Sequence, residues 1–158
     1  MSTSPKIRAK LNRLARAVSA NLSYNLEAKV EFHAAAKAVL REVALALGYP
    51  TADGLIRANL AGIACSGEVY LHTEGLYIQL DRGLTFDPQD GKKFMFRSVV
   101  SKADYTGGRN RWMTYSNLVN GFAGAVAEFK QALEDGRVSA ENSRLRAVYA
   151  ASRQAQVA

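Results

Sequence analysis

The fold of this chain is organised around residues 94–112, which read Phe94-Met95-Phe96-Arg97-Ser98-Val99-Val100-Ser101-Lys102-Ala103-Asp104-Tyr105-Thr106-Gly107-Gly108-Arg109-Asn110-Arg111-Trp112. At its start Phe94, Phe96 and Ser98 recur at period two, which predicts a β-strand with at least one buried face. The pair Gly107-Gly108 then interrupts the pattern, and glycines tolerate the positive φ of a tight hairpin turn. We therefore expect two neighbouring antiparallel strands, the second beginning at Arg111.

The same stretch contains the residues from which we predict a ligand site. Paired glycines can present backbone N–H groups to an anion, and guanidinium groups match the geometry of phosphate or carboxylate. Aromatic rings nearby offer faces on which a base can stack. The predicted ligand-binding residues are Arg97, Lys102, Tyr105, Thr106, Gly107, Gly108, Arg109, Asn110, Arg111 and Trp112. The alternative is a hairpin whose turn needs glycine and whose arginines only keep an exposed strand solvated.

Further strand signals precede this stretch. Residues 69–73 and 76–80 alternate in polarity on either side of Glu74-Gly75, which predicts a β-hairpin. The run Asp87-Pro88-Gln89-Asp90-Gly91 is a strong turn signal before the next strand. Together these patterns predict an antiparallel sheet of three to four strands over residues 68–115.

Helical periodicity flanks the predicted sheet on both sides. Ser4 and Pro5 are typical of a helix start, and we expect helices over residues 5–48 with a polar break at 21–25. A further short helix is expected from Thr51 to about residue 63. After the sheet, helices are expected over residues 117–153, one ending at Gly136 and another starting near Ser139. These elements predict an α+β fold in a single domain that covers residues 1–158.

The chain is basic, with 158 residues, a formal net charge of +7 and an isoelectric point near 9.7. Residues 1–20 and 92–115 each carry a net charge of +5, whereas residues 49–91 carry −4. Such a balance favours anionic partners. If the two basic regions converge they form one anion-attracting face, and if they do not, each is a solvated surface. The basic N-terminal helix itself either binds an anionic partner or docks on the protein's own core.

Several functions are disfavoured by what the sequence lacks. Cys65 is the only cysteine, so an intrachain disulfide is impossible, and no apolar run is long enough to span a bilayer. No secretory signal is recognisable, so we expect a cytoplasmic protein without membrane partners. Two histidines and no Walker-type phosphate loop offer little for catalysis or metal binding. We therefore expect a binding protein, not an enzyme, with no cofactor.

The run Asp104-Tyr105-Thr106-Gly107-Gly108-Arg109-Asn110 is preceded by Arg97 and by the hairpin strand Leu76-Tyr77-Ile78-Gln79-Leu80. This combination resembles a segment of small, mostly uncharacterised proteins of tailed phages and prophages. The resemblance covers about the middle third of the chain. It implies a viral protein acting in the cytoplasm of a bacterial host, and it implies no reaction.

The sequence therefore predicts a small, basic, phage-type protein that binds an anionic ligand through a strand and a Gly-Gly-Arg loop. That ligand is expected to be a nucleotide or a component of host defence. One alternative is a nucleic-acid-binding protein that uses the basic N-terminal helix together with Arg109, Arg111 and Trp112. Another is a structural or oligomeric phage component. Apolar residues between Val138 and Tyr149, with Gly121 and Gly124, suggest a homo-oligomer, and a host protein is a further candidate partner.

Overall fold

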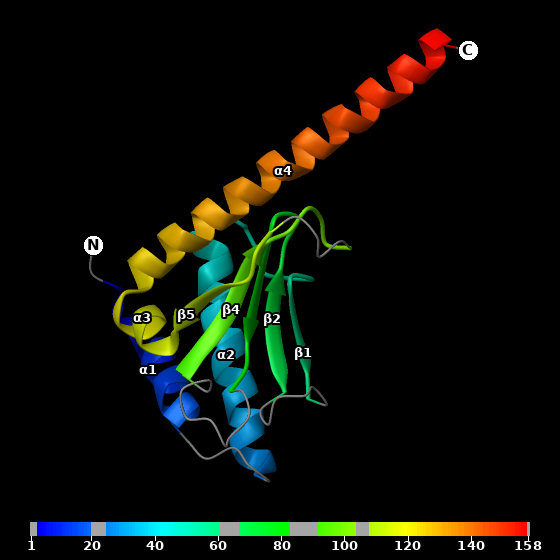
Figure 1. Cartoon of the computed structure of the whole chain (residues 1–158). Helices are drawn as coiled ribbons and strands as arrows, with labels where there is room; N and C mark the ends of the chain where they lie inside the picture. Colours follow the sequence, from blue (N-terminus) through cyan, green and yellow to red (C-terminus); the bar gives the residue numbers. More distant parts are fainter. Residues whose placement is uncertain (1–2, 20–24, 61–66, 83–91, 104–107, 158) are drawn as a thin grey trace.

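Two helices, five strands and two further helices follow one another along the chain (Figure 1). The structure is a computed structural model, and it describes residues 3–19, 25–60, 67–82, 92–103 and 108–157. The helices are α1 (Pro5–Ser19), α2 (Leu26–Ala46), α3 (Tyr115–Asn120) and α4 (Phe122–Val157). The strands are β1 (Ile56–Asn59), β2 (Glu68–His72), β3 (Leu76–Leu80), β4 (Lys93–Ser98) and β5 (Arg111–Thr114). The fold is α+β, as the sequence predicts.

The strands form one antiparallel sheet in the order β1-β2-β3-β4-β5, so each strand pairs with its neighbour in sequence. The prediction of three to four strands was wrong by one strand. The additional strand is β1, which lies within the segment where a short helix was expected. Gly54, at φ 74°, turns the chain just before β1, and Ile56 then pairs with Leu71. The few apolar residues of this segment fit the period of a helix and that of a strand equally well. Pairing with β2 makes the segment a strand.

The C-terminal helices also differ from the prediction, because α4 continues without a break from Phe122 to Val157. Gly136 was expected to end a helix, but it lies inside α4 and is buried. A Cβ atom at position 136 would lie 2.1 Å from the carbonyl oxygen of Gly75. Glycine is therefore required there so that the β2–β3 turn can approach the helix. Here glycine permits a close backbone contact and does not end the helix.

The helices pack on one face of the sheet, which we call the covered face. Figure 1 shows α2 behind the strands and α4 crossing one end of the sheet. Phe96 of β4 meets Phe129 of α4 edge to face, with ring centroids 5.2 Å apart. Burial of one such side chain contributes about 1.5–3 kcal/mol to folding. The core of the covered face also includes Phe32, Val39, Val43, Val69, Leu71, Ile78, Leu80, Phe94 and Leu133.

Helix α1 docks on α2 and α3, and its basic residues take part in this docking. Lys10 forms an ion pair with Glu42, and Arg13 with Glu31 at 2.6 Å. Arg8 donates from Nη1 to the carbonyl oxygen of Val119 at 2.6 Å. Three of the five basic residues of the N-terminal region are therefore used in contacts within the protein.

Candidate functional site

The face of the sheet opposite the covered face is the candidate site, and we call it the open face. Directly opposed residues of antiparallel strands share a face, so the register assigns each side chain. One row crosses all five strands and consists of Arg57, Tyr70, Gln79, Met95 and Trp112. A second row consists of His72, Tyr77 and Arg97. Aromatic and basic side chains thus share this face of the sheet with Gln79 and Met95.

Three rings of the open face contact one another. Tyr77 lies at the centre, with its ring centroid 5.6 Å from that of Tyr70 and 5.2 Å from that of His72. The Tyr77 hydroxyl donates to Oε1 of Gln79 at 2.9 Å, and Nε2 of Gln79 donates to Asp81 at 2.9 Å. These contacts hold the rings in place. The ring of Trp112 stands apart at the β5 edge and is 64 % exposed.

Positive charge gathers around His72 at one end of the open face. Nε2 of His72 lies 3.2 Å from the carbonyl oxygen of Ser101, an acceptor, so this nitrogen carries the proton in a neutral ring. Burial lowers the pKa of His72; the hydrogen bond to Ser101 opposes the shift, and the charges of Lys102 and Arg57 add to it. The effect of both cations on one ring means that Lys102 and Arg57 lie near it from different segments. We call His72, Arg57 and Lys102 the basic corner.

Arg97 and Gly108, two of the predicted site residues, connect β4 to the segment before β5. Nη2 of Arg97 donates to the carbonyl oxygen of Gly108 at 2.7 Å, and Nη1 donates to Oδ1 of Asn110 at 3.4 Å. A Cβ atom on Gly108 would lie 2.3 Å from the carbonyl oxygen of Ser98. Arg97, Gly108 and Asn110 thus hold the two segments together, and Arg97 shares the open face with Tyr77.

Arg111 and Trp112 are adjacent in sequence, but the structure places them on opposite faces of β5. Arg111 pairs with Phe96, and its guanidinium carbon lies 4.9 Å from the centroid of the Phe96 ring on the covered side. Trp112 pairs with Met95 on the open face. Lys102 and Arg109 are exposed in the segments between β4 and β5. Tyr105, Thr106 and Gly107 lie outside the described residues.

Helix α1 and the basic corner do not form one surface, although Arg111 of the second basic region lies on the same side of the sheet as α1. Helix α1 packs on α2 and α3, on the helical side of the sheet, whereas the basic corner lies on the open face. Lys6 and Arg16, the remaining basic residues of the N-terminal region, are exposed on α1. Sequence reasoning missed Arg57, Tyr70, His72 and Tyr77 as site residues. Alternation along β2 and β3 would have placed the last three on one face, but Arg57 depends on the unexpected strand β1.

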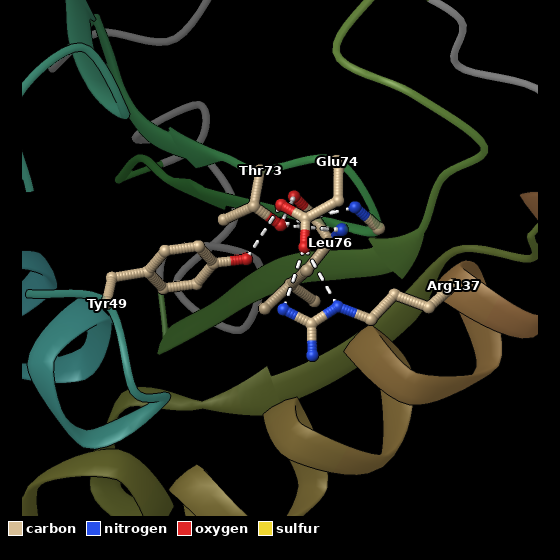
Figure 2. A network of polar contacts seen from close by, with 6 residues as sticks. Tyr49, Thr73, Glu74, Leu76 and Arg137 are labelled. Carbon is tan, nitrogen blue, oxygen red and sulfur yellow. Dashed lines mark hydrogen bonds and ion pairs between the residues drawn. The ribbon is translucent and has the colours of Figure 1, made fainter.

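A second polar cluster joins the β2–β3 turn to α4 and to the segment that follows α2, and Figure 2 shows it from close by. Glu74 accepts a hydrogen bond from the Tyr49 hydroxyl at 2.9 Å and another from Nε of Arg137 at 2.8 Å. Burial opposes ionisation of Glu74, but the bonds from its own backbone N–H, Arg137 and Tyr49 outweigh it and lower the pKa of Glu74. The hydroxyl of Thr73 accepts from the N–H of Leu76 at 3.1 Å. This cluster fastens the turn, and we call it the turn clamp.

No three His, Cys, Asp or Glu side chains among the described residues are placed to hold a metal ion together. None of the described helices has the length and apolarity needed to cross a membrane. Comparisons with protein-family models, with curated proteins and with solved structures each gave no match. The resemblance to phage proteins therefore stays a prediction.

Proposed function

We propose that this protein binds single-stranded nucleic acid on the open face of its sheet. Bases stack on Tyr70 and Trp112, and phosphates lie near Arg57 and Lys102. Stacking of a base on an aromatic ring tolerates any sequence, and cations beside the rings attract the backbone. The protein acts by binding and performs no reaction.

The row from Arg57 to Trp112 supports this function more than any other observation. It crosses four spacings between strands, which amounts to about 19 Å. A row of this length, with the guanidinium of Arg57 at one edge and an exposed indole at the other, suits an extended polyanion that carries aromatic bases. A mononucleotide would cover only part of it. We therefore favour a nucleic-acid strand over a single nucleotide.

Residues 94–112 also contribute to this proposed function, but not as the loop site that the sequence predicts. Trp112 supplies a stacking surface, and Lys102 and Arg109 supply exposed positive charge. Arg97 and Gly108 position the segment before β5 by their contacts with each other and with Ser98. The basic residues of α1 are left out, because they lie on the helical side and most of them contact the protein itself.

A single nucleotide in the basic corner is the second candidate ligand. One observation favours it: the rings of His72 and Tyr77 meet edge to face at 5.2 Å beside Arg57 and Lys102. A phosphate group would contact these cations while the base lies along Tyr70, which is half-buried, since Tyr77 is buried beneath it and His72. Competition between nucleotide and oligonucleotide distinguishes the two ligands.

The test is a binding titration of a fluorescently labelled oligothymidylate, followed by anisotropy at two salt concentrations. Arg57→Ala/Lys102→Ala should reduce the slope of log K against log salt by about 1.4, since each phosphate contact to a single strand contributes about 0.7. Lys6→Ala/Arg16→Ala is the matched control, because it removes the same charge from the helical side and should retain the wild-type slope. Circular dichroism verifies that every variant is folded.

Two outcomes would contradict the proposal. One is a wild-type slope in Arg57→Ala/Lys102→Ala. The other is an equal reduction in this variant and in the control, which would indicate attraction by net charge alone. If a mononucleotide displaces the oligonucleotide completely and binds as tightly, the ligand is the single nucleotide and the strand proposal is wrong.

A further inference from the structure

The C-terminal part of α4 extends away from the rest of the protein. Gly136 is the last buried residue of this helix, and every residue from 141 to 157 is exposed. Figure 1 shows this part of the helix projecting beyond the sheet and the other helices. We call residues 138–157 the arm. At 1.5 Å per residue the arm is about 30 Å long.

The arm carries an apolar stripe that the body does not cover. Val138, Leu145 and Val148 are 50 %, 49 % and 56 % exposed, and they follow the spacing of seven and three residues typical of a helix–helix seam. Val138 lies nine residues after Phe129, which buries its side chain in the core. Nine residues correspond to two and a half turns, so the stripe is turned away from the core-facing side.

A helix in this situation needs a partner. Most helical stability in proteins comes from packing of an apolar face, and residues 141–157 of the arm bury no side chain against the rest of the protein. The arm contains Glu141 bonded to Arg144 as its one ion pair within the described residues, and an exposed pair of this kind adds little stability. Packing of Leu145 and Val148 against a second apolar stripe would stabilise the arm far more.

We infer that the arms of two copies of this chain pair with each other, and that they run antiparallel. The charges select this orientation. A parallel pair would bring Glu141 against Glu141 and each arginine against its own counterpart, whereas unlike charges attract and like charges repel. An antiparallel pair with Leu145 opposite Val148 of the second copy brings Glu141 beside Arg153 of that copy, and Arg146 is then the one arginine that lies near its own counterpart. The pair closes under a two-fold axis, so the assembly stops at a dimer.

The first test is the mass of the protein by sedimentation equilibrium over a hundredfold range of concentration. The expected result is a mass that rises with concentration from one copy of 17.2 kDa to two copies. Leu145→Glu/Val148→Glu should keep the mass of one copy throughout. Ala147→Glu/Ala150→Glu is the matched control, because it adds the same charges at the same spacing on the other side of the arm, and it should dimerise like the wild type.

The second test determines the orientation by disulfide cross-linking in a Cys65→Ser background. An antiparallel pair places residue 138 opposite residue 155 of the second copy, whereas a parallel pair separates them by about 25 Å along the axis. A mixture of Val138→Cys and Ala155→Cys proteins should cross-link, and neither protein should cross-link alone. Cross-linking of each protein alone would show a parallel pair and overturn the orientation.

Two results would overturn the pairing itself. The first is the mass of one copy at every concentration of the wild-type protein. The second is a loss of oligonucleotide binding in Leu145→Glu/Val148→Glu without any difference in mass from the wild type, which would assign the arm to the nucleic-acid surface.

Discussion

The ring of His72 is buried, contacts one backbone carbonyl oxygen and lies near two positive charges. Its position on β2 turns it to the open face, where it contacts Tyr77 and lies close to Ser101. Because burial and the neighbouring cations disfavour the imidazolium, its pKa lies below the ordinary value of about 6.5. A bound phosphate would reverse the effect of those cations.

We expect the pKa of His72 to rise when an oligonucleotide binds, since an anion beside the ring stabilises the imidazolium. By linkage, binding should tighten as the pH falls through the folded-state pKa of His72, and His72→Gln should remove this dependence. The measurement is an NMR titration of the histidine ring protons with and without oligothymidylate. The chain has two histidines, and the resonances of the other, His33, should not respond. An unchanged His72 titration would place the ligand elsewhere.

Two glycines of α4 should respond in opposite directions to the same substitution. Gly136→Ala should destabilise the fold by about 1–3 kcal/mol, because the added methyl group would collide with the backbone of Gly75. Gly124→Ala should stabilise it by about 0.5–1 kcal/mol, because nothing lies within 4 Å of the added group and alanine favours the helix. Chemical denaturation followed by circular dichroism measures both. Equal effects at the two positions would contradict the close approach of turn and helix.

At the scale of elements, the turn clamp determines how the sheet meets α4. Ser98 donates from its hydroxyl to the carbonyl oxygen of Ala132 at 2.6 Å, and the N–H of Val99 donates to the carbonyl oxygen of Gly75 at 3.0 Å. Arg137 contacts Glu74 from α4, and Tyr49 contacts it from the segment that follows α2. The end of β4, the β2–β3 turn and α4 therefore form one connected unit, from which the arm projects.

The turn clamp should make stability depend on acidity. Glu74 has a lowered pKa in the folded state, so its stabilising effect is present above the unfolded-state pKa of about 4.5 and is lost as the pH falls through the folded value. We expect Glu74→Gln to lose less stability than the wild type between about pH 5 and pH 3 in thermal melts. Glu134→Gln, a change at an exposed residue of α4, is the control and should follow the wild type. Identical acid sensitivity in Glu74→Gln and the wild type would refute the role of the carboxylate.

At the scale of the whole molecule, the charge is divided between two sides. The basic residues of α1 face acidic residues of α2, so much of the N-terminal charge is neutralised within the protein. The net charge of +7 therefore overstates the attraction of the helical side.

Pairing of the arms would join two open faces in one assembly. A long oligonucleotide that reaches both faces should then bind more tightly than a short one, by a factor of up to about 10²–10⁴. In Leu145→Glu/Val148→Glu the long oligonucleotide should bind only as tightly as the short one does. The affinity for the short oligonucleotide should be the same as in the wild type. Anisotropy titrations with oligonucleotides of increasing length measure this. If the long oligonucleotide binds more tightly than the short one by the same factor in the dimeric and the monomeric protein, pairing of the arms does not contribute to binding.

Local pattern by itself determined most of the secondary structure. The serine and proline before α1, with Ser4 accepting from Ile7 at 3.3 Å, and the apolar stripes of α1 and α2 act within a few residues. The same holds for the alternation in β2, β3 and β4, since a period of two or 3.6 is a property of the local chain. Candidate site residues such as Lys102 and Trp112 were recognisable by their type alone.

Tertiary structure decided the rest, because it depends on residues distant in sequence. Ile56 lies in a strand because β2 offers it a partner, and Gly136 lies within a helix because Gly75 approaches it there. The adjacent residues Arg111 and Trp112 look alike as candidates, yet the register of β5 against β4 sends them to opposite faces. Pairing and packing are non-local, and no periodicity within one segment contains them.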